Sequence, residues 1–343
     1  MKEINAQGFN MILNEIDLSK TLFVEHCDWD GIQPYILNKF FNINYDKSIC
    51  TNYNEDLEHE HLPNYKTVVY VDFTPNENAR KIIKENDIHC MILDHHIGTK
   101  EEIENFCKEY DKCEYIFDND RCGTKIYYEW LKEQGYKGND VSDEIVELTN
   151  TYDLYKKERS NWDLADKCNR LLYSTTAWYV LKADPTNRIE AYKFFINSML
   201  WKMQNANNFF FNKIETEKIN ADIQKENDIF NELIRNSSTE ISTRKDSKGK
   251  YFAVFNCNSK ISAVANKLME KYKKLDYCIV INAYDENNPK ISLRCKDGFN
   301  LLELNNTSGH EQACGINADT IENMKQFADD LKSKKIYELG YKE

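Results

Sequence analysis

The chain has 343 residues, of which 41% are hydrophobic and 30% are charged, so it is long enough for two domains with hydrophobic cores. Its formal net charge of −12 argues against an extended surface for a long polyanion, because such surfaces neutralise many phosphates with lysine and arginine. A small basic pocket or a metal-lined cleft for a short nucleotide is compatible with this charge.

Eleven cysteines are scattered along the chain without a CxxC pair, which argues against a disulfide scaffold and against a zinc finger. We therefore expect reduced thiols. The N-terminus lacks the basic-then-apolar layout of a signal peptide, and no apolar run approaches the roughly 18 residues that a membrane span needs. The sequence predicts a cytoplasmic protein that does not span a membrane.

The N-terminal half alternates short apolar runs with helical segments of about ten residues, which is typical of βαβ units and a parallel sheet. The expected strands are Thr21–Glu25, Lys47–Cys50, Val68–Asp72, Ile88–Leu93 and Glu114–Phe117. The expected helices are Ile32–Phe41, Asn76–Glu85, Lys100–Tyr110, Asp118–Leu131, Val141–Thr151 and Asn161–Leu181. Backbone amides at the start of the Asp118–Leu131 helix could receive a phosphate.

A second α/β pattern follows in the C-terminal part. Its expected elements are strands Tyr251–Asn256, Tyr277–Ala283 and Lys290–Cys295 and helices Ala263–Lys273, Phe299–Leu304 and Asp319–Lys332. We therefore predict an α/β protein of two domains, a parallel-sheet domain at residues 1–182 and a smaller α/β domain at residues 241–343. A helical connector at residues 183–240 joins them, and its role stays open between a hinge and a homodimer interface.

Three of the expected strands end in side chains that bind metals. These are His26, Asp28 and Asp30 after the first strand, Asp72 at the end of the third, and Asp94, His95 and His96 after the fourth. The carboxyl ends of parallel strands meet at one edge of a sheet, where open α/β folds bind ligands. Imidazole and carboxylate groups together suit divalent metal ions. Taken singly, each aspartate is equally well explained as a helix N-cap or a surface carboxylate.

The motifs HCDWDG, VVYVDFTP and LDHH, in this order, resemble the signature motifs of the DHH phosphoesterase superfamily. Asp153 in ELTNTYDLY matches the lone aspartate that follows a helix in that superfamily. As the fifth motif, the C-terminal stretch ISLRCKDGFN…NNTSGHEQACG resembles its DHH-associated domain, which carries an arginine and a GGGH-like loop. Five motifs in the expected order make this resemblance specific.

The resemblance implies a site for two metal ions, with Mn²⁺ as the expected metal and Mg²⁺ or Co²⁺ as alternatives. The implied ligands are His26, Asp28 and Asp72 for the first ion and Asp30, Asp72, His95 and Asp153 for the second, with Asp72 shared. Which of Asp28 and Asp30 serves which ion stays open.

Two residues of the LDHH motif have implied catalytic roles: Asp94 would orient a ligating imidazole, and His96 would stabilise charge on the phosphate. In the DHH-associated domain, Arg294, Gly309 and His310 are the implied substrate-binding residues. Here the sequence departs from the family, because Thr307-Ser308 replaces two of the glycines.

We therefore expect a phosphoesterase that hydrolyses short single-stranded oligonucleotides or nucleotides, such as 3′-phosphoadenosine 5′-phosphate, by two-metal activation of water. The HxDxDG form of the first motif is also similar to RecJ-like single-strand exonucleases, which usually carry an extra OB-type domain on a longer chain. A non-catalytic nucleotide-binding scaffold is the alternative of another class, disfavoured because the ligand set is intact. An inorganic pyrophosphatase is disfavoured because that branch has a different C-terminal domain.

Overall fold

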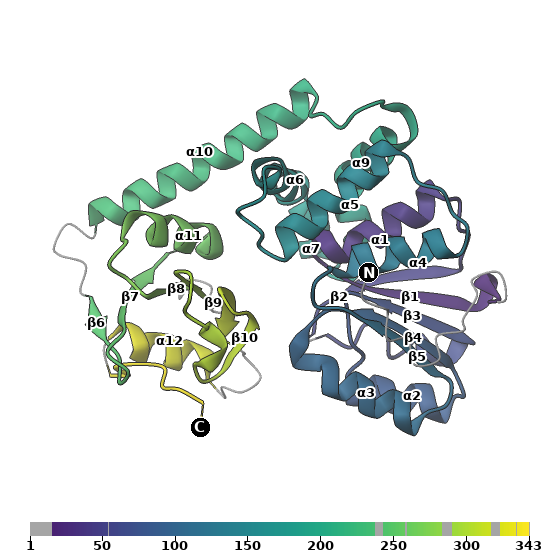
Figure 1. Ribbon diagram of the computed structural model, residues 1–343, viewed down its shortest axis with the longest axis horizontal. Helices are drawn as coiled ribbons and strands as arrows, with labels where there is room; N and C mark the ends of the chain where they lie inside the picture. The colour runs from purple at the N-terminus through teal and green to yellow at the C-terminus, as the bar shows by residue number, and fades with distance from the viewer. Residues whose placement is uncertain are drawn as a thin grey trace. The chain divides into compact units, whose positions relative to one another are not determined.

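A computed structural model of the chain describes residues 16–53, 55–236, 243–257, 259–282, 290–316, 323–333 and 335–342. The chain forms two compact units, Met1–Ile219 and Asn220–Glu343, and their boundary falls within a long helix, α10 (Lys213–Asn236). Each unit has its own β-sheet and helices (Figure 1), which confirms the predicted fold class. The division into three parts at residues 182 and 240 stays a prediction.

The sheet of unit 1 has five parallel strands in the order β2-β1-β3-β4-β5. Its strands are β1 (Thr21–His26), β2 (Lys47–Thr51), β3 (Thr67–Val71), β4 (His89–Asp94) and β5 (Cys113–Phe117). Every predicted strand of this sheet is present, with its ends shifted by no more than one residue. The strand order reverses between β1 and β3, and such a switch point opens a crevice at the carboxyl edge of the sheet.

Helices cover both faces of this sheet (Figure 1): α2 and α3 on one face and α1 and α4 on the other, with α5 and α9 packed behind. The bounds are α1 (Trp29–Phe40), α2 (Glu77–Glu85), α3 (Lys100–Glu109), α4 (Gly123–Glu133), α5 (Asp140–Asp153), α8 (Arg188–Ala191) and α9 (Lys193–Asn205). The predicted helix Asn161–Leu181 is two helices, α6 (Trp162–Thr175) and α7 (Trp178–Ala183), because Thr176 is extended. Within the described residues, no helix is long and apolar enough to cross a membrane.

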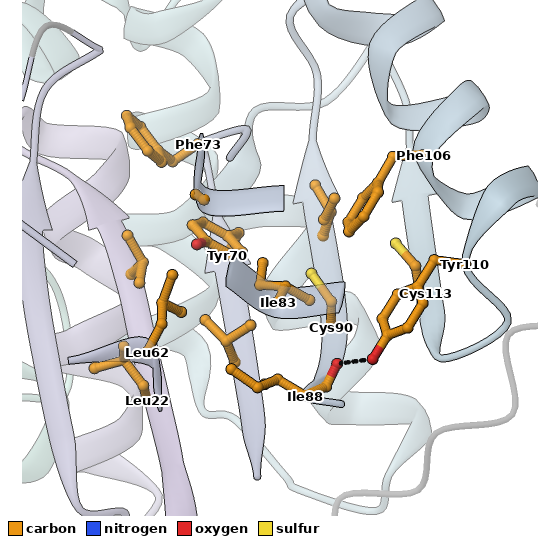
Figure 2. Packing of buried hydrophobic residues seen from close by; sticks show 14 of the residues in the cluster. Leu22, Leu62, Tyr70, Phe73, Ile83, Ile88, Cys90, Phe106, Tyr110 and Cys113 are labelled. Atoms are coloured by element: carbon orange, nitrogen blue, oxygen red, sulfur yellow. Dashed lines mark hydrogen bonds between the residues drawn. The ribbon is translucent and has the colours of Figure 1, made fainter. Parts of the chain in front are cut away.

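The apolar core on the α2 and α3 side of the sheet is shown in Figure 2. Alternate residues of the strands, such as Leu22 and Tyr70, meet Ile83 of α2 and Phe106 of α3, and all are at most 3% exposed. The strand residues on the opposite face, such as Phe23, are buried as well. Burial on both faces explains why the strands are apolar at nearly every position rather than alternating.

The cysteine prediction was wrong at one pair. Cys107 near the end of α3 and Cys113 at the start of β5 form a disulfide, because the turn between the two elements brings their Cα atoms to 4.8 Å. Of the other nine cysteines, seven are buried.

Unit 2 has a mixed six-stranded sheet in the order β10-β11-β9-β8-β7-β6, with helices α11 and α12. Its elements are β6 (Arg244–Lys245), β7 (Tyr251–Asn256), α11 (Ile261–Lys271), β8 (Tyr277–Asn282), β9 (Lys290–Cys295), the 3₁₀ turn η5 (Leu301–Glu303), β10 (Thr307–His310), β11 (Ala313–Ile316) and α12 (Met324–Lys332). The segment expected to be a glycine-rich loop is the hairpin β10–β11, and β6 was not predicted. The start of the predicted last helix lies outside the described residues.

Candidate metal centre

The carboxyl edge of the sheet, around the switch point between β1 and β3, collects the predicted metal-binding side chains of unit 1. His26 is the last residue of β1, Asp72 directly follows β3, and the Asp94-His95 pair lies at the end of β4. Asp153 is the last residue of α5 rather than a residue beyond it. Strand ends and one helix end therefore bring together residues that are up to 127 positions apart in the sequence.

The donor atoms gather around two histidines, His26 and His95, and Asp72 contacts both of them. His26 Nδ1 lies 2.9 Å from Asp28 Oδ2 and 3.5 Å from Asp72 Oδ2. His95 Nε2 lies 3.1 Å from Asp72 Oδ1, 3.3 Å from Asp153 Oδ2 and 3.7 Å from Asp30 Oδ2. Ligand atoms that lie within 4.8 Å of one another, close enough to surround one cation, come from three overlapping groups: His26, Asp28 and Asp72; Asp30, His95 and Asp153; and Asp72, Asp94, His95 and His96.

Hydrogen bonding does not account for this convergence. His26 Nδ1, Asp72 Oδ2 and Asp153 Oδ2 are buried, yet none of them has a hydrogen-bond partner with acceptable geometry. A buried polar atom without a partner is costly and is uncommon in folded proteins. A bound cation would satisfy all three atoms, so the donor set fits metal ions.

The backbone of Asp72 adds a second cost at the shared position. Its φ is +56°, in the left-handed region that residues other than glycine rarely adopt. Its N–H still donates to Leu93 O at 2.9 Å, so β4 holds the residue in place. Backbone strain and buried charge therefore coincide at one residue, as is common at functional sites.

Asp30 accepts hydrogen bonds from the backbone amides that were predicted to bind a phosphate. Gly123 N donates to Asp30 Oδ2 at 2.7 Å and Thr124 N donates to Asp30 Oδ1 at 2.9 Å, at the start of α4. The prediction of a phosphate site at this helix start was therefore wrong. Gly123 is required there, because a Cβ atom on it would lie 2.6 Å from Asp72 Cβ.

Asp94 holds the LDHH turn together. Its Oδ1 accepts the backbone N–H groups of His95 at 2.7 Å and His96 at 3.2 Å, and Oδ2 accepts the hydroxyl groups of Thr74 and Thr99. Its Oδ1 also lies 2.7 Å from His96 Nδ1, so the imidazole that it orients belongs to His96 rather than to His95. Despite burial, the pKa of Asp94 is lowered by His96 and by these donors.

Two carboxyl groups and two imidazole groups of the centre have raised pKa values. Burial, together with Asp72, raises the pKa of Asp30 to about 7, and burial together with Asp30 raises the pKa of Asp153 to about 7. Although burial opposes the charge on both rings, Asp28 raises the pKa of His26 and Asp153 raises the pKa of His95 well above the usual value. Protons thus partly balance a cluster of carboxylates that a cation would balance better.

The three predicted substrate-binding residues lie in the sheet of unit 2. Ala313 of β11 pairs with Arg294 of β9 on one side and with His310 of β10 on the other, so these residues form one row across three strands. The Arg294 guanidinium donates to Ser292 Oγ at 3.0 Å and to Leu293 O at 2.7 Å. Gly309 has a φ of +124°, and a Cβ there would lie 2.9 Å from Ala313 O, so the hairpin requires glycine.

Sequence reasoning missed three residues that contact this centre. Thr74 and Thr99 support Asp94, and Tyr53 in the loop after β2 contacts His96 Nδ1 through its hydroxyl at 3.2 Å. Thr74 lies within the VDFTP motif and could have been considered from its position two residues after Asp72. Tyr53 carries no such signal, because only the fold brings its loop to the end of β4.

Comparison with known proteins gives relatives of low identity and broad coverage. No protein-family model matches the chain. A curated 3′,5′-cyclic-nucleotide phosphodiesterase from Helicobacter pylori is 24% identical over 362 aligned positions, covering 89% of this chain and 95% of the relative. The similarity therefore extends through both units.

Two solved structures share the fold. A DHH-domain protein described as belonging to a family of ribosomal proteins superposes with a TM-score of 0.60 at 12% identity, over 97% of this chain and 88% of that one. RecJ from Thermus thermophilus in complex with Mn²⁺ gives a TM-score of 0.53 at 13% identity, over 96% of this chain and 54% of RecJ. The chain therefore shares the fold of this DHH-domain protein and of RecJ, and its ordered motifs resemble those of the DHH phosphoesterase superfamily.

Proposed function

We propose that the chain is a metal-dependent phosphodiesterase that hydrolyses a phosphodiester bond in a short oligonucleotide or a nucleotide. The observation that carries this proposal is the set of overlapping donor groups at the carboxyl edge of the sheet, in which Asp72 contacts both His26 and His95. Two divalent ions that share a ligand suit the hydrolysis of phosphate esters. The name of the curated relative adds 3′,5′-cyclic nucleotides to the candidate substrates.

The proposed ligands divide into two sets with one member in common. They are His26, Asp28 and Asp72 for one ion, and Asp30, Asp72, His95 and Asp153 for the other. Mixed imidazole nitrogen and carboxylate oxygen suit Mn²⁺, with Mg²⁺ and Co²⁺ as alternatives. When bound, such ions supply an activated water molecule and neutralise charge on the phosphate.

The protein's own part in the reaction is to hold the metal ligands in place and to position the His96 imidazole. The amides at the start of α4 fix Asp30, and Asp94 fixes His96. Although burial opposes the charge, Asp94 raises the pKa of His96, which favours the protonated form of its ring. We assign that ring to the stabilisation of charge on the phosphate, with Asp94 as its positioning residue.

The proposed contribution of unit 2 is to bind the substrate. Arginine binds phosphate through two parallel hydrogen bonds, and a glycine allows a ligand to approach the backbone closely. The row formed by Arg294, Ala313 and His310, with Gly309 beside it, supports this role because it gathers the residues in one part of the sheet. We also keep a cytoplasmic location and a homodimer as predictions.

Two alternatives are carried into the test. A RecJ-like single-strand exonuclease would use the same metal chemistry on long strands. A non-catalytic nucleotide-binding scaffold would require that one of the two ligand sets fails to hold a metal. The intact donor groups and their buried atoms without hydrogen-bond partners support a catalytic centre over the scaffold.

The test is hydrolysis by the purified chain with Mn²⁺ and, in parallel, with a chelator. Substrates are 3′,5′-cyclic AMP, 3′-phosphoadenosine 5′-phosphate, a dinucleotide and 5′-labelled single-stranded RNA and DNA of increasing length. We expect metal-dependent cleavage of the small substrates. Stepwise shortening of long strands would favour the exonuclease instead, and an inactive protein that binds no metal would favour the scaffold.

A further inference from the structure

Tyr53 presents a partly exposed aromatic ring beside the candidate metal centre. One face of its ring stacks on Phe73, with centroids 4.8 Å apart and planes inclined by 28°. Phe73 is 3% exposed and belongs to the apolar core, whereas Tyr53 is 40% exposed. Phe73 therefore supports the Tyr53 ring, the His26 ring lies nearby with its centroid 5.4 Å away, and part of the Tyr53 side chain stays accessible to solvent.

The hydroxyl end of Tyr53 points into the centre. It contacts His96 Nδ1 at 3.2 Å, and the centroids of the two rings are 5.8 Å apart. Burial of this end and the nearby carboxylates, Asp94 foremost, raise the pKa of the Tyr53 hydroxyl, which therefore stays protonated. The ring thus extends from the group assigned to the phosphate toward solvent.

Contacts on both sides of Tyr53 hold its loop. Asn52 accepts a hydrogen bond from Cys27 Sγ at 2.7 Å and donates its N–H to Glu55 Oε2 at 3.0 Å. Glu55 in turn pairs with Arg188 at 2.6 Å, and Arg188, which is 7% exposed, also donates to Cys50 O at 3.1 Å. A ring on such an anchored loop loses little freedom when a ligand stacks on it.

We propose that Tyr53 forms a nucleobase subsite, in which the base attached to the reacting phosphate stacks on its partly exposed ring. This inference rests on the proposed function, because it takes the phosphate to lie at His96. A base and its phosphate are separated by one sugar. The rings of Tyr53 and His96 are neighbours, with centroids 5.8 Å apart, so one nucleotide can reach both. Stacking on an aromatic ring tolerates every base, so the subsite selects nucleotides over other phosphate esters without selecting a sequence.

The experiment compares the binding of AMP and of ribose 5-phosphate to the full chain with Mn²⁺ by calorimetry. The two ligands share sugar and phosphate, so their affinity ratio isolates the base. We expect the wild type to prefer AMP by about tenfold, which is within the range measured for one stacked base. Tyr53→Leu should lose the preference, whereas Tyr53→Phe, which keeps the ring but not the hydroxyl, should retain it.

Two further variants complete the design. Phe210→Leu removes a ring of similar exposure, 44%, that packs against Trp201 of α9, and it should leave the ratio unchanged. Tyr53→Trp enlarges the ring and should keep the preference while its fluorescence is quenched by AMP, a readout that holds even if Tyr53→Leu fails to fold. The subsite is refuted if Tyr53→Leu keeps the wild-type ratio, or if the wild type shows no preference for AMP.

Hydrolysis measured on the same preparations separates this inference from the proposed function. A protein that binds AMP through Tyr53 but cleaves no phosphodiester would contradict the phosphodiesterase and leave the subsite standing. An active enzyme whose AMP preference does not depend on Tyr53 would contradict the subsite alone.

Discussion

The middle of the unit 1 sheet and its carboxyl edge are made by the same strands but carry opposite contributions to stability. In the middle, Leu22, Tyr70 and Ile92 are apolar and no more than 1% exposed, and their burial stabilises the fold. At the edge, Asp30 and Asp72 are no more than 2% exposed but polar, and their burial opposes folding. The apolar middle therefore stabilises an edge that would be unstable alone, and a bound cation would offset the cost of burying the carboxylates there.

The largest effect is expected at Asp72, where a substitution should reduce activity without reducing stability. Asp72→Asn should reduce metal-dependent hydrolysis by more than about 100-fold, because even the loss of a group that supports a ligand costs about 10- to 100-fold. The free energy of unfolding of the metal-free protein should not fall, because asparagine tolerates a positive φ and removes a buried charge. Steady-state kinetics and urea unfolding measure the two quantities.

The matched control for this variant is Asp87→Asn, at a carboxylate of unit 1 that is 74% exposed and pairs with Lys112. It should leave both quantities unchanged. An Asp72→Asn protein that keeps its activity would show that the two ligand sets do not share a functional ligand.

The opposite result is expected in the apolar middle of the sheet. Ile83→Ala in α2 removes a fully buried side chain from the core shown in Figure 2, and it should lower the free energy of unfolding by about 3 kcal/mol. Metal affinity of the folded protein should stay within about twofold, since the centre lies at the strand ends and additivity holds for distant sites. Ile83→Val is the milder control, at about 1 kcal/mol. A loss of metal affinity in folded Ile83→Ala would mean that the two regions are coupled.

Metal binding should depend on pH, because protons and a cation compete for the carboxylates at the edge of the sheet. Asp30 and Asp153 have pKa values raised to about 7, so protons compete with a cation below neutral pH. The apparent affinity for Mn²⁺ should therefore rise by at least about tenfold per pH unit as pH increases toward 7. Calorimetry in two buffers of different ionisation enthalpy counts the protons released, and an affinity that does not change between about pH 6 and 7 would contradict this picture.

The raised pKa values of Asp30 and Asp153 also determine how the stability of the metal-free protein changes with pH. Between about pH 4 and 7 the folded state binds more protons at these two carboxyl groups than the unfolded state does. Their contribution to stability is therefore largest below the unfolded pKa and is lost as pH rises through about 7.

The sequence predicted the middle and the edge of this sheet well, for a simple physical reason. A strand that is buried on both faces is a continuous apolar run, so β1 to β5 could be placed to within one residue. Polar residues that directly follow such runs must gather at one edge, so the proximity of His26, Asp72 and His95 followed from their positions.

What the sequence could not predict depends on contacts between distant segments. Asp30 and Gly123 are 93 residues apart, and nothing local shows that the carboxylate would take the amides at the start of α4. The hairpin β10–β11 is rich in polar residues and shows no apolar alternation, so its strands were taken for a loop. Tyr53 lies in a loop without a pattern, and only the packing of its ring on Phe73 identifies it.

The smallest expected effect concerns a carboxylate that lies inside the apolar region rather than at the edge. Glu25 of β1 is fully buried, its Oε2 accepts from Ser48 and its Oε1 has no hydrogen-bond partner. Burial raises its pKa to about 8, so its contribution to stability is present below about pH 4.5 and is lost as pH rises through 8.

Glu25→Gln removes this charge at the cost of burying an amide, so the net gain in unfolding free energy should be about 1 kcal/mol at about pH 8.5. At about pH 5, where Glu25 is protonated in the folded state, the gain should vanish or reverse, because the amide then replaces a neutral acid. Urea unfolding of the metal-free protein at the two pH values measures this difference. A gain of equal size at both would mean that the apolar region accommodates Glu25 in its charged form, and that buried charge is not confined to the edge of the sheet.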